Sequence, residues 1–207
     1  MGGVRKPYVL SDALWEQIEP LIPKRENTHP FGGGRPRRPD RQCMEAILFV
    51  LSTGCQWKAL DATGLCPGSA AHDRFQEWVK AGVFRRIWEA GLAHYDEFKG
   101  IDWEWLCADG SQGKAPLGGK KSGPNPTDRG KRGVKRSVLC DGAGVVLGVV
   151  IEGANRPDLE LLPKTLECVP DSCQQRLVRW EKKAANYEAM LYLAAGIIAF
   201  QQAGLFG

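Results

Sequence analysis

The chain has 207 residues, which is enough for one full domain or two small ones. Its hydrophobic content of 43% and charged content of 25% describe an ordinary soluble globular protein rather than a chain of biased composition. The net charge of +4 is mild, so the places where charges gather are more informative than their sum.

The sequence shows neither a targeting signal nor the residue spacing of a metal-binding motif. The first residues, MGGVRKPYVLSD, lack an apolar signal core, so no export signal is expected. The apolar run 190–200 is too short to span a bilayer, so we expect a cytoplasmic protein without a membrane partner. The seven cysteines and three histidines lack the spacing of a zinc site, which favours free thiols in a reducing cytosol.

The first hundred residues carry four amphipathic patterns with helix signals, and they predict an all-helical region over 1–100. Ser11 and Ser69 are expected N-caps, and Gly54 is expected to stop a helix. The expected helices span residues 11–23, 39–54, 69–82 and 83–98.

The third of these helices has two interpretations. Its pattern puts Phe75 and Trp78 on the apolar side and leaves His72 and Arg74 for solvent or a ligand. It is therefore either a recognition helix of a helix–turn–helix unit or a plain bundle helix. Likewise, the basic loop 24–38 is either a solvated linker or an arm that contacts phosphates. Its candidate DNA contacts are Arg35, Arg37 and Arg38.

The segment from Ile101 to Asp158 carries the strongest chemical signal. We expect a short strand that ends in an acidic turn at Asp109-Gly110, then a basic loop, then a hairpin turning at Asp141-Gly142. A carboxylate beside a cationic, glycine-rich loop favours chemistry on a phosphate backbone over a disordered loop. The candidate DNA-binding cations here are Lys114, Lys120, Lys121, Arg129, Lys131, Arg132, Lys135 and Arg136.

Two further helices are expected after the hairpin. Asp158 is read as the cap of a short helix that contains Pro163. Residues 177–203 are read as a long, apolar core helix.

Several motifs in a fixed order resemble one known family. They are LSDALWEQIEPLIP, GGRPRRPDRQ, LSTGCQWKAL, HDRFQEWVKAGVFRRIWEAGL, IDWEWLCADGSQGKAPLGG, GPNPTDRGKRGVKRSVLCDG, GANRPD and RLVRWEKKAANYEAMLYLA. Together they cover nearly the whole chain. The chain resembles the DDE transposases of bacterial insertion sequences, in the group named after insertion sequence five.

The resemblance implies an α+β protein with a helix–turn–helix-like DNA-binding region at 1–100. An incomplete RNase H-like α/β core would follow at 101–175, and its C-terminal helix at 176–207. In the family three carboxylates hold two Mg²⁺ ions for DNA cleavage and strand transfer, and Asp109 matches the first of them. The expected partners are double-stranded DNA, namely the inverted repeats of the element, and a second copy in a homodimer.

The chain departs from the family pattern after the hairpin. The stretches that carry the second Asp and the Glu are absent, which indicates an internal deletion between about Asp158 and Arg176. The remaining acids have structural explanations: Asp141 lies in a turn and Asp158 is a cap. Glu160, Glu167 and Asp171 fall at the junction, and Glu181 lies in an exposed Glu-Lys-Lys run. We therefore expect a transposase with a defective catalytic set. The alternatives are a DNA-binding remnant that represses or inhibits transposition, and a decayed gene product without a function.

Overall fold

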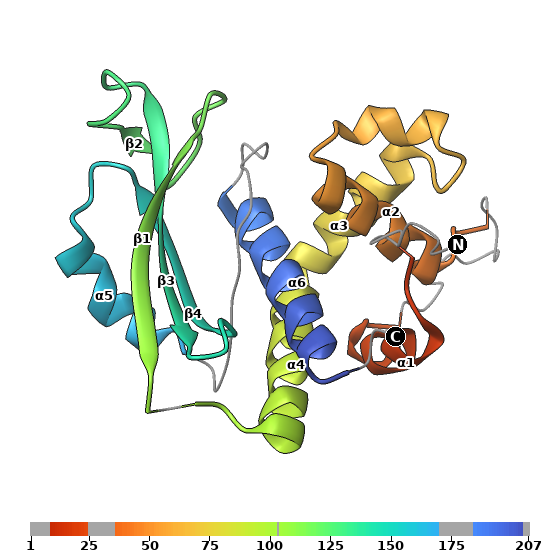
Figure 1. The fold of residues 1–207 in the computed structure, drawn as a ribbon. Helices are drawn as coiled ribbons and strands as arrows, with labels where there is room; N and C mark the ends of the chain where they lie inside the picture. Colours follow the sequence, from red (N-terminus) through yellow and green to blue (C-terminus); the bar gives the residue numbers. More distant parts are fainter. Residues whose placement is uncertain (1–8, 25–35, 103, 170–183, 205–207) are drawn as a thin grey trace, which may run out of the picture. The chain divides into compact units, whose positions relative to one another are not determined.

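The computed structural model describes residues 9–24, 36–102, 104–169 and 184–204 (Figure 1). The chain divides into two compact units between Val83 and Phe84. Its elements are α1 (Asp12–Ile18), the 3-10 helix η1 (Glu19–Leu21), α2 (Asp40–Thr53), the 3-10 helix η2 (Trp57–Ala62), α3 (Gly68–Lys80), α4 (Val83–Lys99), β1 (Leu106–Lys114), β2 (Gly123–Pro124), β3 (Arg132–Asp141), β4 (Val146–Gly153), α5 (Asp158–Glu167) and α6 (Ala184–Gln202). Helices together with an antiparallel sheet confirm the expected α+β class.

The helix boundaries of the first unit largely follow local signals. Ser11 caps α1, and its hydroxyl oxygen accepts a hydrogen bond from the N–H of Leu14 at 3.2 Å. Gly54 ends α2 in the left-handed region at φ 67°, where glycine has no Cβ penalty. Both of these predictions are confirmed.

The start of α3 differs from the prediction, because the N-cap is Pro67 and not Ser69. The carboxylate of Asp61 accepts a hydrogen bond from the N–H of Gly68 at 2.8 Å. This bond satisfies one of the backbone N–H groups that the first turn of a helix leaves unpaired. A Cβ at Gly68 would overlap with the carbonyl oxygen of Trp57. A tertiary contact therefore moves the helix start two residues upstream of the local signal.

The core of the first unit is formed by one face of each helix. The largest fully buried side chains there include Leu14, Ile18, Met44, Ile47, Leu60, Phe75 and Trp78. Burial of such side chains stabilises the unit by about 1.5–3 kcal/mol each before entropy is counted.

The second unit is built on an antiparallel sheet whose central strand is β3. β1 pairs along one side of β3, while β4 and the short β2 pair along the other. The hairpin expected around Asp141-Gly142 is confirmed as β3–β4. Its connection runs over residues 142–145 and is longer than the two-residue turn that was predicted.

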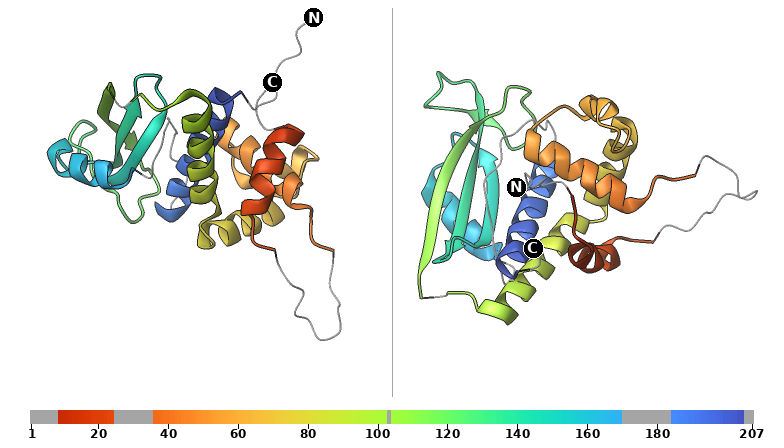
Figure 2. Two further views of the ribbon diagram at one scale, coloured as in Figure 1. Left: turned by 90° about the horizontal axis from the view of Figure 1, so that it is seen from below. Right: turned by 45° about the vertical axis from the view of Figure 1, so that its right-hand side comes forward.

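Helices cover both faces of this sheet (Figures 1 and 2). On one face lies α5, where the hydroxyl of Thr165 donates to the hydroxyl of Ser137 at 2.7 Å. On the other lies α6, whose Leu191 packs with Val134 and Ile151. The alternation of side chains along β3 sets which residues meet which helix.

α4 packs within the sheet-containing unit. The indole N–H of Trp88 donates to the carbonyl of Val146 at 3.4 Å, and its ring stacks on Tyr192 of α6 at 5.1 Å. Gly91 and Gly196 let α4 and α6 approach closely, because a Cβ at Gly91 would lie 2.8 Å from the carbonyl oxygen of Gly196.

In the part of the chain that the structure describes, no helix combines the length and apolarity that a bilayer crossing requires. The predicted deletion point, between about Asp158 and Arg176, falls partly on residues 170–183, which lie outside the described residues.

Candidate functional site

Asp109 lies in the middle of β1 and not in a turn. It pairs with Val138 of β3, and its neighbour Gly110 pairs with Ser137. The strand begins at Leu106 and continues to Lys114, well beyond the predicted turn. The predicted acidic turn at Asp109-Gly110 is therefore wrong, because nine consecutive pairs with β3 override the local turn preference of Asp-Gly.

The side chain of Asp109 is exposed at the edge of the sheet. Its Oδ1 accepts a hydrogen bond from the N–H of Gly110 at 2.8 Å. Asp109 shares a sheet face with Cys107 and Cys140, two free cysteines that lie opposite each other in the register of β1 and β3. Burial raises the pKa of Cys140 to about 12, with smaller raising contributions from Cys107, Asp141 and Asp109.

Asp158 lies against the opposite face of the same strand. Its carboxylate accepts a hydrogen bond from the ammonium of Lys135 at 2.9 Å and occupies the position that a Cβ of Gly110 would take. Because consecutive strand residues point to opposite faces, this carboxylate and that of Asp109 do not converge. Asp158 is the first residue of α5, whose N-cap is Pro157, so the predicted capping role is wrong by one position.

Asp141 is committed to the β3–β4 connection. The residue is 2% exposed, and its Oδ1 accepts hydrogen bonds from the N–H groups of Ala143 at 3.0 Å and Val145 at 2.8 Å. Its Oδ2 accepts one from the hydroxyl of Tyr95 at 3.2 Å. Among the described residues, no three His, Cys, Asp or Glu side chains are grouped closely enough to hold a metal ion.

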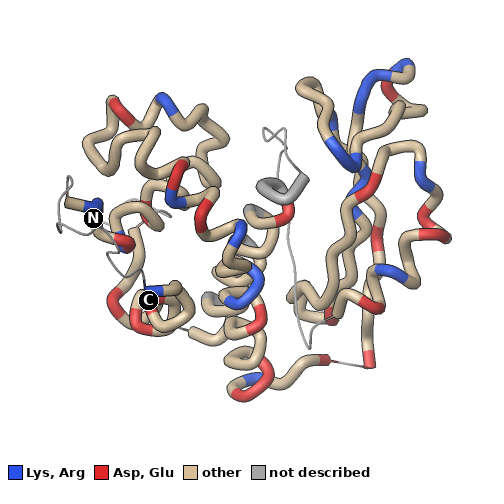
Figure 3. The backbone as a smooth tube through the Cα atoms, turned by 180° about the vertical axis from the view of Figure 1, so that it is seen from behind, with Lys and Arg blue, Asp and Glu red and all other residues tan. Residues whose placement is uncertain are grey.

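Cations gather at the end of β1, at the start of β3 and in the turns between them (Figure 3). We call Lys114, Lys120, Lys121, Arg129, Lys131 and Arg132, which are all exposed, the cationic tip. Two of them lie near carboxylates: Lys114 is 3.8 Å from Asp128, and Lys121 is 2.6 Å from Glu188 of α6. The six cations of the tip outnumber these two carboxylates, so the cluster keeps a net positive charge.

The cationic tip is folded into turns rather than being a disordered loop. Asn125 is 5% exposed, and its side-chain Oδ1 accepts a hydrogen bond from the N–H of Thr127 at 3.0 Å. Its carbonyl accepts from the N–H groups of Asp128 and Gly130. Asn125 was not among the predicted site residues, although Asn before Pro is a turn signal that indicates such a position.

Lys135 and Arg136 lie further along β3, are not exposed, and do not belong to the tip. Lys135 is 7% exposed and lies on the α5 face, bonded to Asp158. Arg136 pairs with Ser111 on the opposite face and is half-buried. The predicted single basic loop from Lys114 to Arg136 is thus wrong at its C-terminal end, where the chain has already entered β3.

The candidate DNA contacts of the first unit differ in exposure. Arg38 is exposed, and Arg37 is exposed but paired with Glu77 at 2.6 Å. His72 packs edge-on against Trp57, with ring centroids 5.2 Å apart. Arg35 lies outside the described residues.

Arg74 was expected to face solvent, and the structure places it inside the unit. It is 5% exposed, forms an ion pair with Asp40 and lies over the ring of Trp78 at 5.7 Å. One of its guanidinium nitrogens donates to the carbonyl of Arg38 at 3.2 Å. These contacts join α3 to the start of α2, which favours a structural role.

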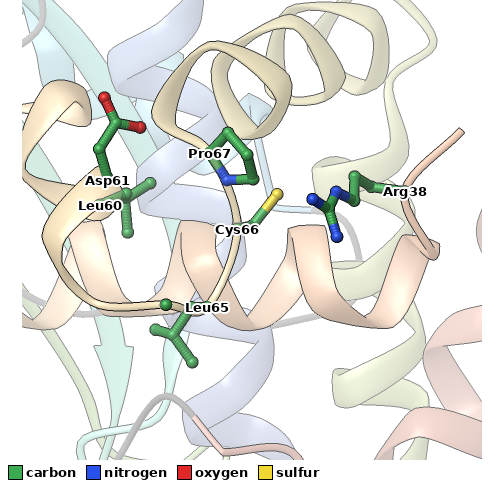
Figure 4. A pocket seen from close by; sticks show the side chains of 7 residues that line it. Arg38, Leu60, Asp61, Leu65, Cys66 and Pro67 are labelled. Atoms are coloured by element: carbon green, nitrogen blue, oxygen red, sulfur yellow. The ribbon is translucent and has the colours of Figure 1, made fainter. Parts of the chain in front are cut away.

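A pocket of about 330 Å³ lies beside the start of α3 (Figure 4). Arg38 extends into it, toward Cys66. The sulfur atom of Cys66, which lines the pocket, is 3.8 Å from that of Cys43. Burial, together with the neighbouring Cys66, raises the pKa of Cys43 to about 12, so this thiol is neutral at physiological pH.

Comparison with known proteins gives a consistent set of relatives. Residues 10–88 match the family model described as "Putative transposase of IS4/5 family (DUF4096)". An "Insertion element IS402 uncharacterized 16.2 kDa protein" from Burkholderia cepacia is 34% identical over 119 residues, which cover 57% of this chain and 81% of the relative. A "Putative transposase for insertion sequence element IS402" from the same organism is 38% identical over 53 residues, which cover 26% of this chain and 25% of that protein. No solved structure matches the chain.

Proposed function

Because the chain belongs to the family of insertion-sequence transposase proteins that includes the IS402 relatives, we propose that it binds double-stranded DNA at the inverted repeats of its element. In this proposal the protein acts in the cytoplasm, on the nucleoid, and is a transposase by lineage. The single observation that carries DNA binding is the cationic tip, a folded and exposed cluster of lysine and arginine side chains.

The tip suits the phosphate backbone for two physical reasons. Exposed cations displace the counterions condensed on DNA, which drives association without regard to sequence. The tip is also pre-folded by Asn125 and by left-handed residues such as Gly118 and Gly130, at φ 66° and 72°, so little ordering is needed on binding.

Sequence reading would fall to the first unit. We propose that α3 acts as the recognition helix of a helix–turn–helix-like region, with Arg37, Arg38 and His72 near its DNA-facing side. Arg35 is part of the same proposal. Arg74 would support this surface from within, because its guanidinium connects α2 and α3.

The proposed catalytic lineage is the DDE type with an RNase H-like core, of the insertion-sequence-five group. Asp109 on β1 would be the first acid, and the succession of β1, β3, β4 and α5 is compatible with the first part of such a core. A Mg²⁺ pair, the family's cofactor, requires several converging oxygen ligands. The described residues do not fit it, because Asp141 is buried in a turn and Asp158 lies on the far face of β1.

We therefore propose a catalytically defective protein with an internal deletion between about Asp158 and Arg176. The protein would occupy element ends and inhibit transposition by an intact copy. An active transposase remains the competing function, since Asp109 is exposed and available.

The experiment that separates these functions uses the purified chain and duplex DNA of the element ends. We expect a gel shift that weakens steeply as salt rises, because phosphate contacts release counterions. We expect no nicks with Mg²⁺ or Mn²⁺. Metal-dependent nicks that vanish in Asp109→Ala would show an active enzyme, and a gel shift that is absent or insensitive to salt would overturn the DNA-binding proposal.

A further inference from the structure

The outer edge of β1 has backbone groups that no described strand pairs with. Alternate residues of an antiparallel strand point their N–H and C=O groups toward the same neighbour. The N–H of Ala115 donates to the carbonyl of Arg132 at 2.9 Å, which continues the β1–β3 register. Cys107 and every second residue from it to Gly113 therefore point their backbone groups at β3. The residues between them point outward.

This edge lacks the usual protection of an exposed strand. Natural edges are shortened, bulged, or interrupted by proline and inward-facing lysine. β1 has nine residues without a proline, pairs with β3 without a register shift, and has its single lysine, Lys114, at its end. All residues from Leu106 to Gly110 are exposed. Such an edge is a template for another extended strand.

We propose that the outer edge of β1 pairs antiparallel with β1 of a second copy of this chain, with the two-fold axis at Gly110. This register aligns all nine residues of each strand. Its hydrogen-bonded pairs join Gly110 to Gly110 of the second copy, and Ala108 to Gln112 of that copy. The inference does not depend on DNA binding.

Repulsion between like charges disfavours the register whose axis lies at Asp109. With the axis at Gly110, Asp109 lies directly opposite Ser111 of the second copy, and Leu106 lies opposite Lys114. With the axis at Asp109, the two Asp109 carboxylates would face each other at the close spacing of a non-hydrogen-bonded pair, which is unfavourable.

The pairing also replaces the hydrogen bond that Asp109 makes in the single chain. There its carboxylate accepts from the outward N–H of Gly110 at 2.8 Å. In the pair, that N–H donates to the carbonyl of Gly110 in the second copy, and the Ser111 hydroxyl of that copy donates to the released carboxylate. The number of satisfied groups is kept while the edges are covered.

Pairing of one strand from each copy buries little surface, so the dimer is weak and concentration-dependent. Sedimentation equilibrium of the full chain in reducing buffer measures it directly. We expect a reversible monomer–dimer equilibrium. A chain that stays monomeric at the highest concentration that remains in solution contradicts the proposal, as does association into open, higher oligomers.

Two substitutions at one residue test the register. Ser111→Asp places like charges opposite Asp109 at two symmetric positions and is expected to raise the dimer Kd about tenfold, whereas Ser111→Lys is expected to lower it by a similar factor. Within the chain these changes act in the opposite sense, because Ser111 pairs with Arg136. If the substitutions acted only on the fold, Ser111→Asp would therefore stabilise the chain, whereas the dimer proposal predicts weaker association for this variant.

Ala108→Pro provides a second test that spares the fold. The N–H of Ala108 points outward, so a proline at this position removes a donor from the outer edge without removing a β1–β3 hydrogen bond. Circular dichroism checks that the variant is folded. Loss of the dimer supports the proposal. Unchanged association in both Ala108→Pro and Ser111→Asp shows that the copies meet elsewhere and overturns it.

Discussion

Removal of the Asp158 carboxylate is expected to destabilise the second unit more than removal of its partner Lys135. The two side chains meet at 2.9 Å, but the lysine side chain is 9% exposed and the aspartate side chain 67%. Asp158→Ala leaves a nearly buried ammonium without a partner. Loss of one member of a fully buried pair costs about 3–5 kcal/mol. Water at the exposed end screens this pair, so we expect a loss of about 1–2 kcal/mol.

Lys135→Met removes the buried charge together with the ion pair. The methionine keeps most of the side-chain volume, and Asp158 becomes a solvated carboxylate at a helix N-terminus, which is favourable. We expect a change in the free energy of unfolding within about 0.5 kcal/mol. The double variant is expected to resemble Lys135→Met.

Urea unfolding followed by circular dichroism measures these differences. Glu160→Ala is the matched control, because Glu160 is also acidic, lies in the same first turn of α5 and makes only an exposed pair with Arg156 at 3.7 Å. Equal losses in Asp158→Ala and Glu160→Ala would refute the reasoning, and so would a larger loss in Lys135→Met than in Asp158→Ala. Either result would reopen a chemical role for Asp158.

Two further predictions concern buried groups of the described fold. Tyr95→Phe should lower the free energy of unfolding by about 1 kcal/mol, because it removes one hydrogen bond to Asp141. Asp141→Ala should lower it by about 3 kcal/mol, because it also leaves the N–H groups of Ala143 and Val145 unpaired. Urea unfolding measures both losses, and equal losses would contradict the assigned contacts. Thiol labelling at pH 8 with mass-spectrometric readout should modify exposed Cys107 before Cys43. Burial raises the pKa of Cys43 from 9.0 to about 12, which lowers its thiolate fraction about 1000-fold, so equal rates would show that the first unit opens readily.

The sequence predicted what local chemistry decides. The Ser11 cap, the stop at Gly54 and the β3–β4 hairpin depend on residues close together in the chain, and all three are found. It also predicted that cations are concentrated between Asp109 and the middle of β3, although Asp109 itself lies in mid-strand, five residues before Lys114.

What it missed depends on distant partners. Asp109 was assigned to a turn because pairing with β3 cannot be read from Asp-Gly alone. Arg74 was assigned to the surface by helical spacing, but Asp40 and Trp78 supply an ion pair and an aromatic face that make its burial favourable. Lys135 was counted with the loop because its partner Asp158 lies on another element.

In the proposed function, the cationic tip holds DNA by its phosphates. The direct test measures the salt dependence of duplex binding for Lys120→Glu/Lys131→Glu beside Lys99→Glu/Lys164→Glu, which makes the same charge change at exposed lysines of α4 and α5. We expect the tip variant to bind every duplex more weakly and its slope of log K against log salt to fall in magnitude by about 2, whereas the control keeps the wild-type slope. Equal behaviour of the two variants would contradict it.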